Sequence, residues 1–154
     1  MVIRRGGRQD VRFLRDMLHH AYYWRERNPA NGPGPAARYI KGWGRPGDTV
    51  LIAIDDGFPI GAAWYRIMPR SDPGFGYVGT GVPELIIGVR PIWRAHGVGR
   101  ALLQELSDQA RVQGFARLSL SVERGNFAVT LYRSEGFAVT QSGIGRDTMV
   151  KRLR

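Results

Sequence analysis

A run of apolar residues that leads through two closely spaced glycines into a helical pattern constrains the fold of this chain more than any other feature. The run is Glu84–Val89, and its nearly continuous apolar character is typical of a strand buried at the centre of a sheet. From Val98, which lies between Gly97 and Gly99, apolar residues recur at every fourth position, at Val98, Leu102, Leu106 and Ala110. That spacing predicts an amphipathic helix, which Gly114 is suited to end. The segment therefore predicts a buried strand, a tight turn and a helix in succession.

Further elements alternate on both sides of this segment. Before it we expect strands at Val2–Arg5, Thr49–Ile54 and Ile60–Met68, helices at Arg8–Trp24 and Ala36–Trp43, and loops at Asn28–Pro35 and Pro69–Gly81. Asp55-Asp56-Gly57 is a hairpin signal between two of these strands. After the segment we expect a strand at Leu118–Glu123, a helix at Asn126–Glu135, and strands at Phe137–Thr140 and Thr148–Arg152. This alternation predicts an α/β (α+β) fold in which helices flank a central mixed sheet.

The length and the charge of the chain limit its organisation and its partners. With 154 residues we expect one domain over residues 1–154. The formal net charge is +10, and all basic residues except Lys41 and Lys151 are arginines. Such a charge favours an anionic partner. A genome-wide coding preference for arginine explains the excess equally well.

Several classes of protein are excluded by what the sequence lacks. There is no cysteine, hence no disulfide framework, thiolate nucleophile or cysteine-based zinc site. Met1–Arg8 has no apolar core of signal-peptide length, and no stretch approaches the roughly 18 apolar residues of a membrane span. His19, His20 and His96 have no second ligand at metal spacing. We therefore expect a cytoplasmic protein without a metal or a membrane partner.

The turn before the long helix is suited to bind phosphate. Glycines let the backbone approach a ligand closely, and the start of a helix offers free N–H groups and a positive dipole end. Arg94, His96 and Arg100 add positive potential. The alternative is an ordinary tight turn with exposed arginines. The chain lacks Gly-x-x-x-x-Gly-Lys-Ser/Thr, which excludes a Walker P-loop, and the Gly-x-Gly-x-x-Gly at 74–79 leads to a strand, so we interpret it as a coincidence of composition.

Two motifs together resemble a known family. Arg94-x-x-Gly97-x-Gly99-Arg100-Ala101, directly after the buried strand, resembles the cofactor-binding motif of the GNAT superfamily of acetyl-CoA-dependent N-acetyltransferases. Leu118–Phe137 is similar to that family's strand, Asn-led helix, Leu-Tyr pair and Gly-Phe ending. The resemblance covers Glu84–Phe137, with departures at Ala95, where many members have Gly, and Phe127, where Pro is frequent. It implies a single GNAT-like domain whose mostly antiparallel sheet is splayed at the cofactor site.

The resemblance also implies a cosubstrate and the residues that bind it. The cosubstrate is acetyl-CoA, whose pyrophosphate would lie on the glycine turn. Its pantetheine arm would pair with the central strand like an added strand, through main-chain bonds. Asn126 would hold this arm or shape the gap for it. The implied binding residues are Ile87, Gly88, Val89, Arg94, Ala95, His96, Gly97, Val98, Gly99, Arg100 and Asn126.

Tyr132 and Glu84 are the catalytic candidates. By resemblance, Tyr132 protonates the departing thiolate, and Glu84 removes the proton of the amine directly or through water. Glu84 begins an apolar run, where a carboxylate is unexpected, and partial burial would raise its pKa. The neutral amine attacks the thioester, and a backbone N–H near Ile87–Val89 stabilises the oxyanion. The alternatives are a packed core aromatic for Tyr132, and an exposed strand end or an arginine partner for Glu84.

The acceptor amine is not identified by the sequence. A small amine, an amino-acid-like compound and a protein N-terminus stay open, and the nearby acids Glu84, Asp72 and Glu26 are few for a polyamine pocket. Aromatic rings can hold an apolar or cationic amine. The available ones are Tyr22, Tyr23, Trp24, Trp43, Trp64, Tyr65, Phe75 and Tyr77. Trp64 and Tyr65 are neighbours on a strand and must point to opposite faces, so a role in the core is the alternative.

Three function classes compete on this evidence. The first is an N-acetyltransferase that acts on a primary amine by direct attack in a ternary complex. The second is a non-catalytic acyl-CoA-binding domain of the same fold. The third is a basic nucleic-acid-binding module, but no helix carries a dense arginine stripe and no recognisable nucleic-acid motif occurs. A homodimer stays open as the assembly.

Overall fold

The computed structural model describes residues 1–22 and 34–154. Its helices are the 3₁₀ helices η1 (Arg8–Asp10), η2 (Gly34–Tyr39) and η3 (Pro91–Trp93), and the α-helices α1 (Val11–Tyr22), α2 (Val98–Val112) and α3 (Ala128–Ser134). Its strands are β1 (Val2–Arg5), β2 (Thr49–Asp55), β3 (Phe58–Arg66), β4 (Glu84–Val89), β5 (Arg117–Glu123), β6 (Ala138–Ser142) and β7 (Arg146–Arg152).

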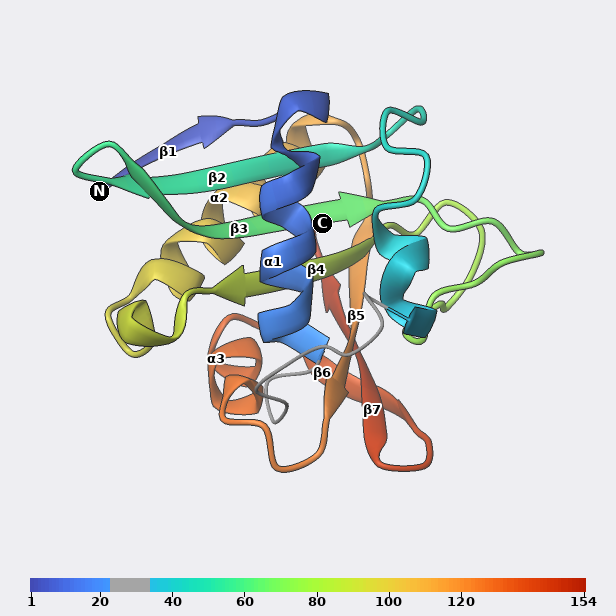
Figure 1. The fold of residues 1–154 in the computed structure, drawn as a ribbon. Helices are drawn as coiled ribbons and strands as arrows, with labels where there is room; N and C mark the ends of the chain where they lie inside the picture. Colours follow the sequence, from blue (N-terminus) through green and yellow to red (C-terminus); the bar gives the residue numbers. More distant parts are fainter. Residues whose placement is uncertain (23–33) are drawn as a thin grey trace. The chain divides into compact units, whose positions relative to one another are not determined.

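Within the described residues the strands form one open sheet in the order β1-β2-β3-β4-β5-β7-β6 (Figure 1). The β1–β2, β2–β3, β5–β7 and β6–β7 pairs are antiparallel, and β4–β5 is parallel. The expected mixed, mostly antiparallel sheet with flanking helices is therefore confirmed. The predicted bounds of β4 agree with the structure, because its apolar run is sharply delimited.

Other bounds differ for local reasons. The first predicted helix is divided into η1 and α1, and its expected end at Trp24 lies outside the described residues, as does most of the expected loop at Asn28–Pro35. The expected helix at Ala36–Trp43 is only the 3₁₀ helix Gly34–Tyr39. The predicted helix at Asn126–Glu135 begins at Ala128, because the Asn126 Oδ1 accepts a hydrogen bond from the Ala128 N–H at 2.8 Å.

The chain divides into two compact units. Unit 1 comprises Met1–Tyr65 and Ile86–Leu106, and unit 2 comprises Arg66–Leu85 and Ser107–Arg154. The residues of β4 and α2 are shared between the units. The expectation of one domain over residues 1–154 stays a prediction.

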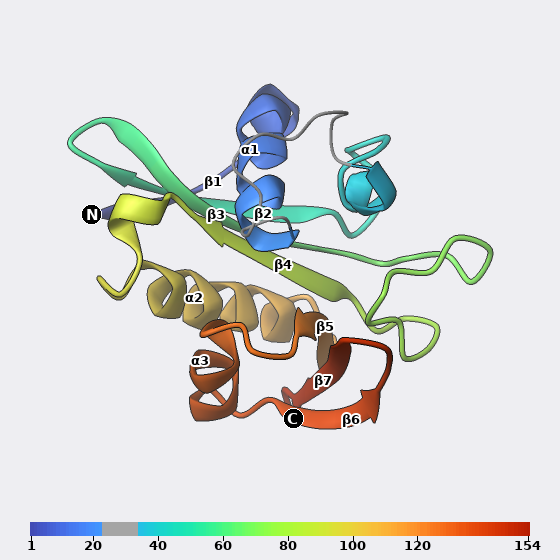
Figure 2. The ribbon, with the colours of Figure 1, turned by 60° about the horizontal axis from the view of Figure 1, so that its bottom comes forward.

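In unit 1 a hairpin and two helices surround the end of β4. Asp56 and Gly57, with φ of 49° and 81°, join β2 to β3 in the turn that the sequence predicted. Figure 2 shows α1 on one side of these strands and the start of α2 on the other. The buried face of α1 consists of Leu14, Met17 and Leu18, none of which is exposed.

Backbone meets backbone where α1 crosses β4. A Cβ atom on Gly88 would collide with the carbonyl oxygen of Met17 and lie 2.7 Å from the Met17 carbonyl carbon. On β3, a Cβ on Gly61 would lie 3.2 Å from the Gly88 carbonyl oxygen. Gly88 therefore lets the helix lie directly on the strand.

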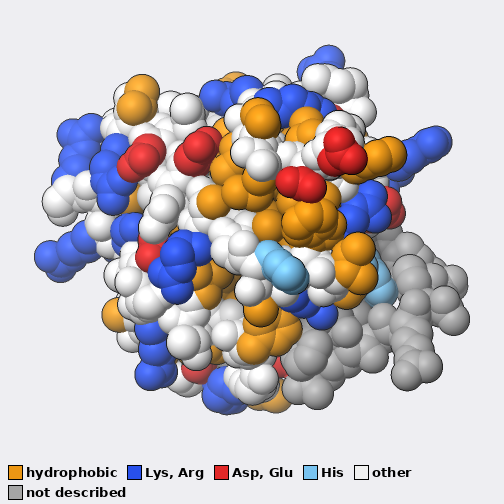
Figure 3. Space-filling view, turned by 90° about the vertical axis from the view of Figure 1, so that its left-hand side faces the viewer, with side chains coloured by type: hydrophobic (Ala, Val, Ile, Leu, Met, Phe, Trp, Pro, Cys, Tyr) orange, Lys and Arg blue, Asp and Glu red, His pale blue; other side chains and the backbone are white. Residues whose placement is uncertain are grey.

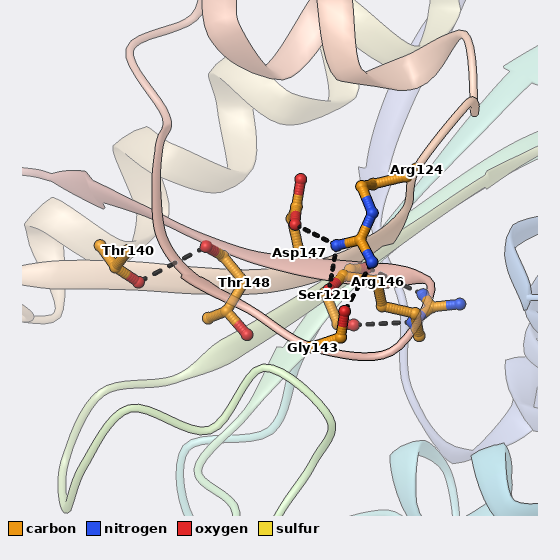
Figure 4. Close-up of polar contacts among 7 residues, drawn as sticks. All are labelled: Ser121, Arg124, Thr140, Gly143, Arg146, Asp147 and Thr148. Atoms are coloured by element: carbon orange, nitrogen blue, oxygen red, sulfur yellow. Dashed lines mark hydrogen bonds and ion pairs between the residues drawn. The ribbon is translucent and has the colours of Figure 1, made fainter.

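In unit 2 two arginines fasten the β6–β7 hairpin (Figure 4). The Arg124 guanidinium donates to Asp147 Oδ1 at 2.7 Å and to the Gly143 carbonyl at 2.6 Å. The Arg146 Nε donates to Ser121 Oγ on β5 at 2.8 Å. These bonds hold the turn of the hairpin against the end of β5.

Candidate functional site

The end of β4 is anchored before the glycine turn begins. The Arg90 N–H donates to the Ile60 carbonyl at 2.9 Å, and its Nε donates to the Pro59 carbonyl at 2.8 Å. The Arg90 guanidinium also lies 5.3 Å from the centre of the Phe13 ring on α1. Arg90 therefore joins the end of β4 to both β3 and α1, which gives the turn a fixed starting point.

The turn itself uses two residues with left-handed backbone. Ala95 has φ of 61° and Gly97 has φ of 82°. The Ala101 N–H then bonds to the Gly97 carbonyl at 3.1 Å and begins α2. The N–H groups of the first helical residues have no partner inside the helix, and a Cβ on Gly97 would meet no atom within 4 Å. The turn thus presents helix N–H groups beside open space, the arrangement that an anion requires.

Basic groups surround this turn. His96 and Arg100 are exposed, and Arg94 is half-buried. Burial lowers the pKa of the Arg94 guanidinium from its ordinary value. The His96 ring packs edge-on against Trp93, with centroids 5.9 Å apart. The predicted cluster of Arg94, Ala95, His96, Gly97, Val98, Gly99 and Arg100 is therefore assembled in unit 1.

His20 is a neighbour of the turn that the sequence reasoning did not assign. The pKa of His20 is lowered, mainly by burial and further by the charges of Arg94, His19 and Arg90. At neutral pH the His20 imidazole is accordingly uncharged in the field of Arg94. The only sequence signal was a pair of histidines near the end of the first helix.

A surface cavity lies beside the turn on the same unit. It measures about 400 Å³, and its lining includes Phe58, Trp93 and the acids Asp55 and Asp56. Figure 3 looks onto the side of the N-terminus and the β2–β3 hairpin, where hydrophobic side chains lie among acidic and basic ones. Phe58, which lines the cavity, has 70% of its surface exposed.

The segment predicted to pair with pantetheine lies in the same unit as the turn. Gly88 is buried against α1, whereas Ile87 and Val89 are half-buried. The β4–β5 register pairs Glu84 with Ser119, at the start of β4, and both residues belong to unit 2. The predicted binding residues other than Asn126 are therefore grouped in unit 1.

Glu84, in unit 2, is buried rather than at an exposed strand end. Only 1% of its surface is exposed, and its Oε2 accepts a hydrogen bond from the Gly76 N–H at 3.0 Å. A Cβ on Gly74 would collide with the Glu84 carboxylate, and one on Gly76 would lie 2.6 Å from the Leu120 carbonyl carbon. The glycines at 74 and 76, interpreted above as a coincidence, thus have a steric role in covering this carboxylate.

Tyr132 is buried in unit 2 on α3. Its exposed fraction is 8%, and its ring packs edge-on against Phe137, with centroids 6.0 Å apart. Burial raises the pKa of the Tyr132 phenol to about 12, while the nearby Arg146 charge opposes this shift. The phenol is therefore protonated at neutral pH, as a proton donor must be.

The aromatic residues expected at the acceptor wall have different environments. Trp64 and Tyr65 are fully buried because both faces of β3 are covered, and the Trp64 Nε1 donates to the Tyr39 carbonyl at 3.0 Å. Of the two roles left open by the sequence, the structure therefore supports the core role for both residues. Tyr22 stacks on Tyr39 at 5.2 Å, and Phe75 is 41% exposed beneath the Arg146 guanidinium. Tyr23, Trp24 and Glu26 lie outside the described residues.

Comparison with known proteins decides the family. The family model described as the acetyltransferase (GNAT) family matches residues 13–137. The chain belongs to the GNAT acetyltransferase family. A ribosomal-protein-alanine N-acetyltransferase from Brucella melitensis has the same fold, with a TM-score of 0.71, 25% identity, and 99% of each chain covered.

Two further proteins to which the chain is similar are a curated relative and a solved structure. An L-methionine sulfoximine/L-methionine sulfone acetyltransferase from Salmonella typhimurium is 32% identical over 128 residues, covering 80% of this chain and 69% of the relative. PaiA N-acetyltransferase from Thermoplasma acidophilum, solved in complex with coenzyme A, has a TM-score of 0.68 at 17% identity, with 99% of each chain covered. The chain spans between 30% and 69% of the length of the curated relatives it matches.

Clusters of metal ligands and membrane-spanning helices are both absent from residues 1–22 and 34–154. Among them, no group of three or more His, Asp or Glu side chains is arranged to hold a metal ion. None of their helices has both the length and the apolar character that crossing a bilayer requires.

The left-handed Ala95 leads to a first prediction. Replacing Ala95 with Gly removes the Cβ strain of this conformation but loosens the unfolded chain, so we expect a net stabilisation of up to about 1 kcal/mol. Denaturant unfolding measures it. The control Ala101→Gly, within α2, should instead lose about 0.5–1 kcal/mol. Equal destabilisation by both changes would show that position 95 carries no strain.

Proposed function

We propose that this GNAT protein transfers an acetyl group from acetyl-CoA to a primary amine, by direct attack in a ternary complex. The glycine turn at the start of α2 carries the proposal, because it combines free helix N–H groups, open space at Gly97 and the charges of Arg94, His96 and Arg100. These features suit the pyrophosphate of coenzyme A. The backbone of Ile87, Gly88 and Val89 would bind the pantetheine arm.

Asn126 has a more limited role in the proposed site. Its Oδ1 accepts the Ala128 N–H, which leaves the second lone pair of this oxygen and the amide NH₂ for a ligand. In the proposal Asn126 therefore shapes the start of α3 and can also contact the pantetheine arm.

The reaction needs two proton transfers. The protonated amine first loses a proton, which Glu84 accepts through water. Transfer through water is proposed because the Glu84 carboxylate is buried and covered by Gly74 and Gly76. The amine nitrogen then attacks the thioester carbonyl and forms the amide bond as the C–S bond breaks. The Tyr132 phenol gives its proton to the departing thiolate and regains one from solvent.

The acceptor is proposed as a class only. The names of the relatives include a protein N-acetyltransferase and an acetyltransferase for amino-acid analogues. We propose that this chain acts on the amine of a small molecule or of a protein N-terminus. The absence of cysteine is consistent with direct transfer, since no acyl-cysteine intermediate can form.

Calorimetric titration with acetyl-CoA, followed by a free-thiol release assay, tests the proposed activity. We expect saturable binding that Arg94→Gln weakens about tenfold, because a charge-assisted phosphate contact is lost. Arg117→Gln, exposed at the start of β5, is the matched control and should bind normally.

Thiol release is then measured with L-methionine sulfoximine, an alanine-led peptide and a diamine as acceptors. Binding without release for any amine would identify a non-catalytic acyl-CoA-binding domain. Absence of acetyl-CoA binding would overturn both interpretations.

Tyr132→Phe isolates the proposed acid. We expect kcat to fall about a hundredfold, with KM for acetyl-CoA and the melting temperature nearly unchanged, since the ring contact with Phe137 is kept. Because the phenol pKa is raised to about 12, the acid form persists, and wild-type kcat should not decline between pH 8 and pH 10. Unchanged turnover in the variant would leave Tyr132 a core aromatic.

Glu84→Gln isolates the proposed base. The Gln side chain can still accept the Gly76 N–H, so the fold should survive while proton removal is lost. We expect kcat at pH 7 to fall at least about tenfold and to recover as rising pH deprotonates the amine. Glu105→Gln, exposed on α2, is the control. An unaltered pH–rate profile would make Glu84 purely structural.

A further inference from the structure

A second cavity in unit 1 has a basic rim and an apolar floor. It lies between the start of α1 and the segment that follows η2, and its volume is about 680 Å³. This size is within the range of small-molecule sites. Its lining residues are Arg8, Val11, Arg15, Ala37, Ile40, Lys41, Gly42 and Trp43. None of the residues assigned above to the cofactor or to catalysis is among them.

The charge of this cavity is entirely positive. Its lining contains two arginines and a lysine but no acid. Among the residues that the structure describes, neither Arg8 nor Arg15 forms an ion pair, although the chain pairs Arg4 with Asp10 and Arg124 with Asp147. Within residues 1–22 and 34–154, Arg8 and Arg15 thus carry charges that form no ion pair.

Two acids in the segments that form the cavity, Asp10 and Asp48, already have hydrogen-bond partners. Both Asp10 carboxylate oxygens accept from the Arg4 guanidinium, at 2.8 and 3.1 Å, and Oδ2 also accepts from the Gly7 N–H at 2.9 Å. These contacts lower the pKa of Asp10, the Arg4 bond most, so it stays ionised and paired. Asp48 accepts the N–H groups of Gly44 and Arg45, each at 2.9 Å. The bonds of Asp10 and Asp48 are therefore made to groups other than Arg8 and Arg15, and a carboxylate ligand can pair with these two arginines.

The backbone makes room for one of the rim cations. Gly44 has φ of 111°, and a Cβ there would lie 2.7 Å from the Arg8 Nε and Nη2 atoms. The Arg8 guanidinium therefore lies against the bare backbone of Gly44, at the edge of the cavity. Any side chain at position 44 would displace it.

The floor of the cavity is apolar. Ile40 is 5% exposed and closes it from below, and Val11, Ala37 and Trp43 are partly exposed at its walls. An apolar group can displace water from these surfaces while its charged end reaches the rim. A purely polar anion would leave the floor uncovered.

We propose that this cavity is a binding site for a small amphipathic carboxylate, an anion that carries an aromatic or branched apolar group. The apolar group contacts Ile40 and Trp43, and the carboxylate binds between Arg8 and Arg15. Arginine suits this role because its planar donor pairs match a carboxylate. The proposal does not depend on the acetyltransferase activity and also accounts for part of the arginine excess.

Three probes with one ring system test the charge requirement. They are 1-naphthaleneacetate, the neutral 1-naphthaleneacetamide and the cationic 1-naphthylmethylamine, each titrated by calorimetry at low salt. We expect the carboxylate to bind about tenfold more tightly than the amide, and the amine to bind most weakly. As the salt concentration is raised, the affinities of the carboxylate and of the amine should both approach that of the amide.

Variants and NMR locate the binding. Arg8→Gln combined with Arg15→Gln should reduce the carboxylate affinity to that of the amide. Arg12→Gln, an exposed arginine of α1 outside the cavity, should leave it unchanged. The Trp43 indole N–H signal, assigned with Trp43→Phe, should shift on titration with the carboxylate. Saturating coenzyme A should not compete.

Four results would overturn the proposal. They are equal affinity for all three probes, no binding of the carboxylate up to its solubility limit, an unmoved Trp43 signal, and competition by coenzyme A. A fifth such result is an equal loss of carboxylate affinity in Arg12→Gln and in the Arg8→Gln, Arg15→Gln variant, which would show that only the net charge of the protein matters. Thermal unfolding of each variant verifies that these exposed substitutions leave the fold intact.

Discussion

The direct contact between the backbones of α1 and β4 is the constraint on which unit 1 depends. Gly88 has no side chain to separate the Met17 carbonyl from the strand, so the helix lies as close to the sheet as atoms allow. The apolar face of α1 then buries Leu14, Met17 and Leu18 completely. Since Arg90 also binds β3 and faces Phe13, the same packing fixes where β4 ends and the glycine turn starts. A backbone contact therefore sets the position of the residues that we expect to bind phosphate.

In unit 2 the comparable constraint is a buried charge. The Glu84 carboxylate cannot be left in the protein interior without hydrogen-bond donors, and the loop supplies one through the Gly76 N–H. Gly74 and Gly76 can approach the carboxylate and β5 only because they lack side chains. The loop, the carboxylate and the strand thus stabilise one another. In the proposed reaction, a carboxylate held in this way would take the proton of the amine through water rather than by direct contact.

The sequence predicted those features that depend on short-range patterns. The limits of β4, the hairpin turn at Asp56 and Gly57, and the helix after the glycine turn all follow from spacing along a few residues. It left alternatives open where the environment comes from distant parts of the chain. Trp64 and Tyr65 were candidates for both the acceptor wall and the core, and both are buried because both faces of β3 are covered. The basic cavity could not be predicted, since it brings Arg8 and Trp43 together from segments far apart in the sequence.

The charge balance of the chain bears on the kind of amine that suits the proposed acetyl transfer. The described acids Asp10 and Asp147 bind arginines, and Glu84 binds the Gly76 N–H, so these carboxylates are not placed to attract a cationic substrate. With a net charge of +10 the protein repels polyamines unless a local acidic group offsets it. An α-amino group, with a pKa of about 7.7–8.0, is deprotonated far more easily at neutral pH than a lysine side chain at about 10.4. The proposed mechanism, in which Glu84 acts through water, is therefore better matched to an α-amine, on an amino acid or at a protein N-terminus, than to a strongly basic acceptor.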